Sequence, residues 1–458
     1  MTLAALARRS VLALALAALA ACSRRAPGPN LLLVSVDTLR ADRLSCYGGA
    51  ADAGIAICAL GERGVRYAWA FSTAPSTAPS VASILTSRYP SFHGVTELFA
   101  TTLAPEQRTV AEELAAAGYD TAAVVSNPVL APERQLGQGF AVYDAEMTRH
   151  ERNRPQLVER AAKDTTDAAL AWLAQAKEPW FLWVHYQDPH GPYEPPNAPP
   201  VRDAPGARRL PLLEDNSGRG GIPAYQRLPG VFGTETYEAR YRAELDYLDP
   251  ELSRLFRVAA ASQRKLGVLL TADHGEAFGE DGYWFAHGHS LGLEQIHVPL
   301  LWRPPEGGAG LVITSPVSNL DVAPTLLAAA GVAPPREFQG RPLPLAEPSA
   351  PRTLFAQHRL RVAAISGGLY LARDLDGFTA DVPDPVSGGR LYPLPPRSAR
   401  LPADGRVPAY ESADTAAVQP LARELTDFLG PARAAASEAV QALPEETRKQ
   451  LEALGYLR

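Results

Sequence analysis

The chain has 458 residues, of which 46% are apolar and 21% are charged, so it can bury a large core in one main domain with a smaller one beside it. Its net charge is −6 and its isoelectric point is near 5.9. These values exclude a strongly basic surface, and we expect no nucleic-acid partner.

The N-terminus has the features of an export signal. Two arginines precede an apolar stretch over 11–21, which is too short to span a bilayer. Small residues then lead to Cys22, a pattern that resembles the signal of bacterial lipoproteins, in which this cysteine is lipidated and becomes the mature N-terminus. The resemblance implies a signal peptide over 1–22, a linker over 23–29 and a protein lipid-anchored in the cell envelope, on the periplasmic side. Ser23 favours the outer membrane. The alternative is a hydrophobic helix with an incidental cysteine.

The first apolar run, NLLLVSVD, predicts a strand that ends at Asp37. A turn and a short helix over 54–66 follow. Cys46 and Cys58 lie in this region, and in an oxidising periplasm they could form a disulfide. Two small buried thiols are an equal alternative.

The next predicted helix starts close to Thr77. Pro75 and Pro79 rule out a helix that runs through this residue, whereas VASILT beyond them has helical spacing. Thr77 is therefore expected at or near a helix N-terminus, where free backbone N–H groups and the helix dipole favour an anion. A helix over 109–118 then leads into a strand that ends at Asn127.

The rest of the chain continues the alternation of helices and strands. The expected segments are a helix over 156–176, a strand ending at Asp188 and His190, a polar loop over 189–235 at the rim of a site, a helix over 236–262, a strand ending at Asp273 and His274, a strand over 297–303, a helix over 321–331, short β-like pieces within 353–374 and a terminal helix over 443–457. We expect a main domain over 30–345 and a smaller α+β region over 346–458.

Four of the apolar runs end in side chains suited to metal or phosphate chemistry. Such runs are typical of strands buried on both faces of a parallel sheet, and ligands bind outside the carboxyl ends of these strands. We therefore predict an α/β fold with a large, mostly parallel sheet flanked by helices, and one site assembled from across the chain. Two carboxylates and an imidazole, from Asp37, Asp273 and His274, suit a divalent cation such as Ca²⁺, Zn²⁺, Mg²⁺ or Mn²⁺.

Several stretches together resemble the sulfatase branch of the alkaline phosphatase superfamily. They are VDTLRADRLSCYGG at 36–49, TAPSVASILTSRYPSFHGV at 77–95, HYQDPHGPYEPP at 185–196, TADHGEAFGE at 271–280, HGHSLGLEQIHVPLL at 287–301, NLDVAPTLLAAAGV at 319–332 and QLEALGYL at 450–457. The resemblance implies an alkaline-phosphatase-like fold and a metal-dependent ester hydrolase. It also implies that Asp37, Asp273 and His274 bind the metal beside the nucleophile.

The nucleophile position departs from the family pattern. Family sulfatases carry a Cys or Ser in a C-x-P-x-R motif, which matures to formylglycine. Alignment of this motif places Thr77 at the nucleophile and Val81 at the arginine. Threonine is not a substrate for that maturation, so we expect no formylglycine, with Thr77 as nucleophile and metal ligand. A sulfated or phosphorylated threonine must be hydrolysed by attack on its sulfur or phosphorus atom, as in the Thr-using phosphotransferases of the superfamily. This requirement favours phosphate esters slightly over sulfate esters. The alternative is an inactive site in which Thr77 only caps a helix.

The resemblance also assigns groups around the substrate. Asn127 stands where sulfatases have a Lys-Trp-His element and resembles a phosphate-holding Asn, although a turn Asn explains it nearly as well. His190 and His289 align with a substrate-contacting His and Lys. Asp188, His190, His287 and His289 could instead complete a second metal site. Three further residues are given mainly local roles: Asp42, Arg88 and His93.

Three functions remain from the sequence alone. The first is a lipid-anchored hydrolase or phosphotransferase acting on a small-molecule, glycan or lipid-headgroup ester. The second is a catalytically silent envelope lipoprotein that binds an anionic glycan or lipid headgroup, which the loss of the arginine at Val81 favours. The third is sulfatase activity without formylglycine. Retention of every expected metal ligand favours catalysis.

Overall fold

The computed structural model describes residues 28–96, 101–151, 158–196, 198–347, 349–358, 361–366, 368–374, 389–393, 420–421 and 423–430. Its centre is an eight-stranded sheet. In order across the sheet the strands are β14 (Leu311–Ile313), β2 (Val65–Tyr67), β13 (Leu300–Arg303), β9 (Leu266–Ala272), β1 (Asn30–Val36), β8 (Trp180–Tyr186), β4 (Asp120–Val125) and β5 (Val142–Asp144). Within this sheet β13 alone is antiparallel to its neighbours. The predicted large, mostly parallel sheet is confirmed.

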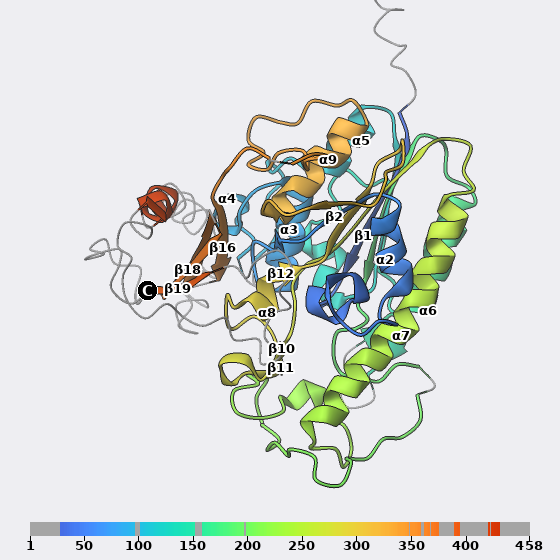
Figure 1. Ribbon diagram of the computed structural model, residues 1–458. Helices are drawn as coiled ribbons and strands as arrows, with labels where there is room; N and C mark the ends of the chain where they lie inside the picture. The colour runs from blue at the N-terminus through green and yellow to red at the C-terminus, as the bar shows by residue number, and fades with distance from the viewer. Residues whose placement is uncertain are drawn as a thin grey trace, which may run out of the picture.

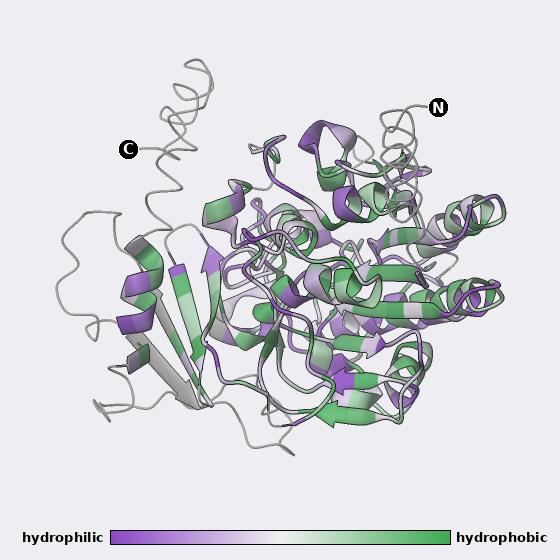
Figure 2. Ribbon diagram, turned by 90° about the horizontal axis from the view of Figure 1, so that it is seen from above, coloured by the Kyte–Doolittle hydropathy of each residue, from purple (hydrophilic) through white to green (hydrophobic). Residues whose placement is uncertain are grey.

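Helices cover both faces of this sheet (Figure 1). On one face lie α2 (Ile55–Glu62), α6 (Ala162–Leu173) and α7 (Thr234–Ala259), and on the other lie α3 (Thr77–Thr86), α5 (Val110–Ala116) and α9 (Val322–Ala329). The inner strands are buried along their whole length: every residue of β1, β8 and β9 is buried. In Figure 2 the strands of the central sheet are mainly in the hydrophobic colour, and the helices around them are mixed. Burial of the inner strands explains their continuous apolar sequences.

Among the described helices, two depart from the sequence-based expectation. The helix expected over 54–66 ends at Glu62, because Val65 and Arg66 belong to β2. The helix expected over 156–176 begins only at Ala162. Val158 and Glu159 instead form β7 (Val158–Glu159), which pairs with β6 (Arg149–His150). An ion pair of 2.7 Å between Arg149 and Glu159 reinforces this pairing. An antiparallel strand pairing therefore takes the place of the helix at Val158 and Glu159.

Short elements surround the carboxyl edge of the sheet. They are the three-stranded sheet of β12 (His297–Val298), β3 (Ala70–Phe71) and β15 (Val317–Ser318), the hairpin of β10 (Ala277–Phe278) and β11 (Trp284–Ala286), and the helices α4 (Pro90–His93) and α8 (Leu293–Ile296). The loop over 189–235 packs against this hairpin and α7 through a cluster that includes Tyr193, Tyr237 and Phe285. The loop is thus a fixed wall beside the carboxyl edge.

A second, antiparallel sheet follows the main one. Its strands are β16 (Leu354–His358), β17 (Arg361–Ser366), β18 (Leu369–Asp374) and β19 (Gly389–Pro393). Alternate residues of β17 face two sides: Ala363 and Ile365 pack toward α8, and Val362 and Ala364 toward the helical residues 420–421 and 423–430. The expected β-like pieces within 353–374 are β16, β17 and β18, whereas β19 was not expected. Figure 1 shows the sheet beside α4 and α8.

Two further expectations concern covalent and membrane features. Cys46 and Cys58 form a disulfide, with 5.6 Å between their Cα atoms. Across the described segments, none of the helices combines the length and apolarity that a bilayer crossing requires. The predicted signal peptide over 1–22 and the terminal helix over 443–457 lie outside the described residues.

Candidate active site

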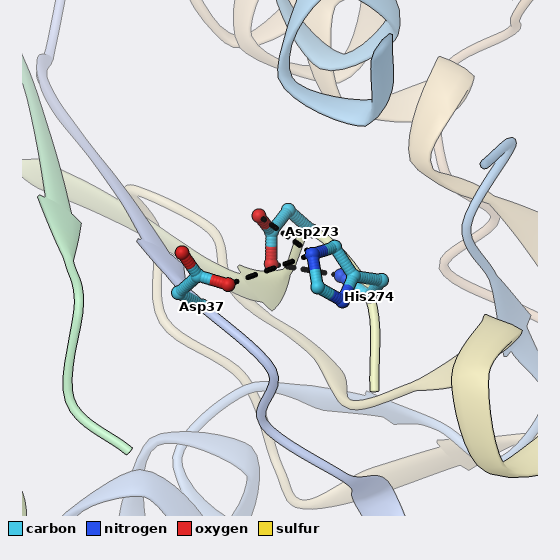
Figure 3. A group of neighbouring side chains, drawn as sticks. All are labelled: Asp37, Asp273 and His274. Carbon is cyan, nitrogen blue, oxygen red and sulfur yellow. Dashed lines mark hydrogen bonds and ion pairs between the residues drawn. The ribbon is translucent and has the colours of Figure 1, made fainter. Parts of the chain in front are cut away.

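The carboxyl ends of β1 and β9 bring three buried side chains together. Val36 at the end of β1 pairs with Ala272 at the end of β9, so the next residues, Asp37 and Asp273, lie side by side. His274 follows Asp273 directly. One ligand atom from each of these three residues lies within 4.8 Å of the others, and each residue is 0% exposed (Figure 3). We call these residues the Asp-Asp-His triad.

The triad has the donor arrangement of a cation site. His274 Nδ1 lies 2.9 Å from the carbonyl oxygen of Gly275, to which it donates, so Nε2 presents a lone pair. That lone pair faces Asp37 Oδ1 at 3.5 Å and Asp273 Oδ2 at 3.6 Å. Both oxygens are buried without a hydrogen-bond partner. Three converging acceptors in a buried place repel one another unless a cation lies between them, so the residues fit a divalent metal.

The electrostatics agree with this arrangement. Burial, followed by the nearby charge of Asp37, raises the pKa of Asp273 well above its usual range. Burial also acts to raise the pKa of Asp37, but His190, His185 and His274 outweigh it and lower this pKa below its usual range. A bound cation would relieve the repulsion between the two carboxylates.

Thr77 lies beside the triad, at the start of α3. It is the first helical residue, as the flanking prolines predict, and only 1% of its surface is exposed. Its Oγ1 lies 3.2 Å from His274 Nε2. Ser80 Oγ donates to the carbonyl oxygen of Asp273 at 2.6 Å and thereby fixes the first turn of α3 to the end of β9.

Asn127 makes the turn contact that the sequence allowed and also donates to the triad, whereas its contact with phosphate stays a prediction. Its Oδ1 accepts from the backbone N–H of Val129 at 2.8 Å, which is a turn contact. Its Nδ2 donates to Asp37 Oδ2 at 2.6 Å. One of the two amide hydrogens is thereby used on Asp37, and the other is left for a ligand.

His190 and His287 also lie near the triad. The centroid of the His287 ring lies 4.5 Å from the ring centroid of His274 and 5.1 Å from that of His190. His287 Nδ1 lies 3.1 Å from Glu276 Oε1. The other oxygen of Glu276 accepts from the Tyr193 hydroxyl at 3.0 Å. Glu276 thus fixes the ring of His287 beside the triad.

Two further expected site residues have other contacts. His289 stacks against Tyr283, with 5.3 Å between ring centroids, and its contact with substrate stays a prediction. Asp188 lies with Glu244 and Arg149, and burial raises its pKa to about 6. In the described part of the chain, the one group of three or more His, Cys, Asp or Glu ligands is the Asp-Asp-His triad. The structure therefore does not assemble the second metal site considered for Asp188, His190, His287 and His289.

The residues expected to have local roles do so. Asp42 forms an ion pair with Arg40 at 2.8 Å. Arg88 donates to Gln107 at 2.8 Å, and His93 shares a hydrogen bond of 3.0 Å with Ser83.

Sequence reasoning missed His185, Tyr193 and Glu276. His185 lies inside β8, 0% exposed, with Nε2 3.7 Å from Asp37 Oδ2. A histidine inside an apolar run, one residue before the end of a parallel strand, was the available signal for it. Glu276 lies two residues beyond His274 and was open to the same reasoning, whereas nothing in the sequence marked Tyr193.

Comparisons with known proteins complete the description. A family model described as Sulfatase matches residues 29–332. An uncharacterized sulfatase of Escherichia coli, YidJ, is 26% identical over 352 residues, which cover 68% of this chain and 70% of that protein. A solved phosphonate monoester hydrolase from Silicibacter pomeroyi has a TM-score of 0.66 at 20% identity, over 87% of this chain and 95% of that one. A protein solved with its substrate D-glucosamine-2-N,6-O-disulfate has a TM-score of 0.65 at 18% identity, over 90% and 98% of the two chains.

Proposed function

The chain belongs to the sulfatase family of ester hydrolases, and on that premise we propose that it is a metal-dependent hydrolase that uses Thr77 as its nucleophile and prefers phosphate to sulfate esters. The observation that carries this proposal is the contact of 3.2 Å between Thr77 Oγ1 and His274, within the Asp-Asp-His triad. A hydroxyl at the start of a helix, beside three converging ligands, is well placed for attack on an anionic ester.

The residues supply the steps of a displacement. A divalent cation held by Asp37, Asp273 and His274 would polarise the ester and lower the pKa of the Thr77 hydroxyl. The Thr77 hydroxyl loses its proton to solvent, Oγ1 attacks phosphorus or sulfur, and the bond to the leaving alcohol breaks. The free N–H of Asn127 donates to an oxygen of the group under attack. Water then attacks the same central atom, the bond to Thr77 Oγ1 breaks, and a proton of the water returns to Thr77.

The leaving alcohol would lie on the side of His190 and His287. Both are more exposed than the triad: His287 is 12% exposed, and the triad residues are 0% exposed. Burial lowers the pKa of both imidazoles, that of His287 to about 3, so each ring is neutral. His287 can donate an N–H hydrogen bond to the departing oxygen, which takes its proton from solvent. Glu276 supports His287 in this role because it fixes the ring through Nδ1.

Three points support phosphate esters over sulfate esters. A formylglycine hydrate releases sulfate by eliminating across its own C–O bond, and an unmodified threonine cannot do so. Val81, in the place of the family arginine, is 0% exposed in the hydrophobic core and brings no cation to the ester. A similar fold belongs to a phosphonate monoester hydrolase, although at 20% identity this likeness extends to the fold alone.

The test is a comparison of three aryl esters on the purified, metal-loaded protein. We expect turnover of an aryl phosphate or an aryl phosphonate monoester to exceed that of the matching aryl sulfate. Mass spectrometry of the peptide with residue 77 should show unmodified threonine. A clear preference for the aryl sulfate would contradict the phosphate assignment. Metal binding without turnover of any of the three would favour the silent binding protein, for which the buried Val81 is the supporting observation.

We also propose that the natural substrate is a small-molecule, glycan or lipid-headgroup ester at the periplasmic face of the envelope, with the protein held there by lipidated Cys22. The support is the N-terminal sequence pattern, together with a similar fold solved with a sulfated glucosamine. Detergent partitioning of the mature protein tests the anchor.

A further inference from the structure

Three buried polar side chains beneath the triad have no role in the proposed reaction. They are Ser35 on β1 and Trp183 and His185 on β8, and each is at most 1% exposed. Register pairs Ser35 with His185. Residues in register on parallel strands, and residues two apart on one strand, face the same side of a sheet. Ser35, His185 and Trp183 therefore share one face with Asp37, which follows Ser35 by two residues.

The hydrogen bonds among them have a defined direction. Trp183 Nε1–H can only donate, and it donates to Ser35 Oγ at 2.8 Å. Ser35 Oγ also lies 2.8 Å from His185 Nδ1. If Nδ1 donated as well, the serine hydrogen would have no partner in a buried place, which costs free energy. The favoured arrangement is that Ser35 donates to Nδ1, so the ring hydrogen of His185 is on Nε2.

That hydrogen faces the triad. His185 Nε2 has no hydrogen-bond partner and lies 3.7 Å from Asp37 Oδ2. At this distance the attraction is electrostatic, and no hydrogen bond has formed. Asn127 donates to the same oxygen at 2.6 Å. The other oxygen, Oδ1, faces His274 and has no donor. The two oxygens of Asp37 thus have separate surroundings: donors of the protein face Oδ2, and Oδ1 is left for a metal.

We propose that Trp183, Ser35 and His185 form a donor chain that positions Asp37 for metal binding, with His185 as the residue that acts on Asp37. The proposal rests on the metal site of the proposed function. These are positioning residues, because none of them is placed against the substrate or the metal. Partners of this kind orient a ligand, and their loss typically lowers metal affinity by about 10- to 100-fold.

The experiment measures Mn²⁺ affinity by calorimetry on the purified protein and four variants. His185→Leu removes the ring hydrogen, His185→Gln keeps an amide donor of similar reach, and Ser35→Ala removes the group that directs the ring. Tyr186→Phe is the matched control, because it removes a buried hydrogen bond of 2.8 Å to Thr166 from the same strand, on its opposite face. Melting temperatures of the metal-free proteins measure any general loss of stability.

We expect about a tenfold loss of affinity in His185→Leu and a smaller loss in Ser35→Ala. His185→Gln should recover part of the loss, and Tyr186→Phe should bind as the parent does. Equal affinity in the parent, His185→Leu and Ser35→Ala would overturn the inference and leave the metal site standing. A parent that binds no Mn²⁺ would overturn the metal site itself.

Nitrogen-15 NMR of labelled histidines provides a second measurement, which needs no variant to fold except the one used for assignment. His185→Gln identifies the His185 signal. We expect the Nε2–H tautomer in the metal-free parent, and the Nδ1–H tautomer would overturn the direction of the chain.

Discussion

Replacement of Thr77 by alanine tests the proposed nucleophile with little disturbance of the fold. The side chain has one hydrogen-bonding contact, to His274 at 3.2 Å. Loss of such a contact costs about 1 kcal/mol of stability. The backbone at the start of α3 does not depend on it, because Ser80 fixes this turn to Asp273. Thr77→Ala should therefore stay folded and keep its metal.

The effect on rate should be much larger than the effect on stability. Removal of an activated nucleophile typically lowers kcat about a thousandfold or more, or about 4 kcal/mol of transition-state stabilisation. We expect Thr77→Ala to lose nearly all turnover of an aryl phosphate, and Thr77→Ser to keep a good part of it. Ser76→Ala is the matched control, because Ser76 is the adjacent hydroxyl and makes no side-chain capping bond to α3. If Thr77→Ala stays within a few-fold of the parent, Thr77 is not the nucleophile.

Three other predictions concern the metal, the acidic residues and the anchor. Metal analysis should give one divalent ion per chain, and this ion should be lost in Asp273→Asn and kept in Asp188→Asn. Equal loss of the ion in both variants would show that the site has been assigned to the wrong residues. Burial, then the charge of Asp188, raises the pKa of Glu244 well above its usual range, so the folded protein keeps a proton that the unfolded chain releases above about pH 4. The free energy of unfolding of the parent should therefore fall as pH rises above that value. Urea titrations should show that the free energy of unfolding of Glu244→Gln increases relative to the parent between pH 5 and pH 8. A difference between the two proteins that does not change with pH would contradict this pKa shift. Finally, mature protein should partition into detergent, Cys22→Ala should not, and an intact signal peptide by mass spectrometry would exclude lipidation.

Sequence patterns predicted the fold and the triad because both depend on short-range rules. Continuous apolar runs predict buried parallel strands, and parallel strands bring their carboxyl ends to one edge. Asp37 and Asp273 follow strands that pair in register, so they meet at that edge. The position of Thr77 followed from its two prolines in the same way, since proline limits where a helix can begin.

The patterns did not predict the contacts that the loop residues make. His287 and His289 are two residues apart, and the structure shows that His287 contacts Glu276 whereas His289 stacks on Tyr283. These residues lie within and directly beside the hairpin of β10 and β11, whose path is set by long-range packing. No local pattern encodes such a path.

Asp188 could have been placed by the alternation of side chains along a strand. His185 faces Asp37, and Tyr186 faces Thr166 of α6 on the other side of the sheet. A side chain two positions beyond Tyr186 is expected on that same side. Asp188 does lie there, near Glu244 of α7. The assignment of Asp188 to the metal considered its residue type and overlooked its position in the alternation.

This division of the carboxylates between the two faces has a consequence for the chemistry. Two carboxylates and one divalent cation have no net charge, so an anionic ester approaching the triad meets no net repulsion from it. A third carboxylate about 4 Å from the ester would add a repulsion of about 4 kcal/mol at the effective dielectric constant near a protein surface. Asp188 is kept from the ester by the sheet itself, where Arg149 compensates its charge. The alternation of β8 therefore keeps Asp188 away from the side of the sheet that carries His185 and Asp37. A further carboxyl group on that side is that of Glu276, and burial raises its pKa to about 7, which reduces its negative charge.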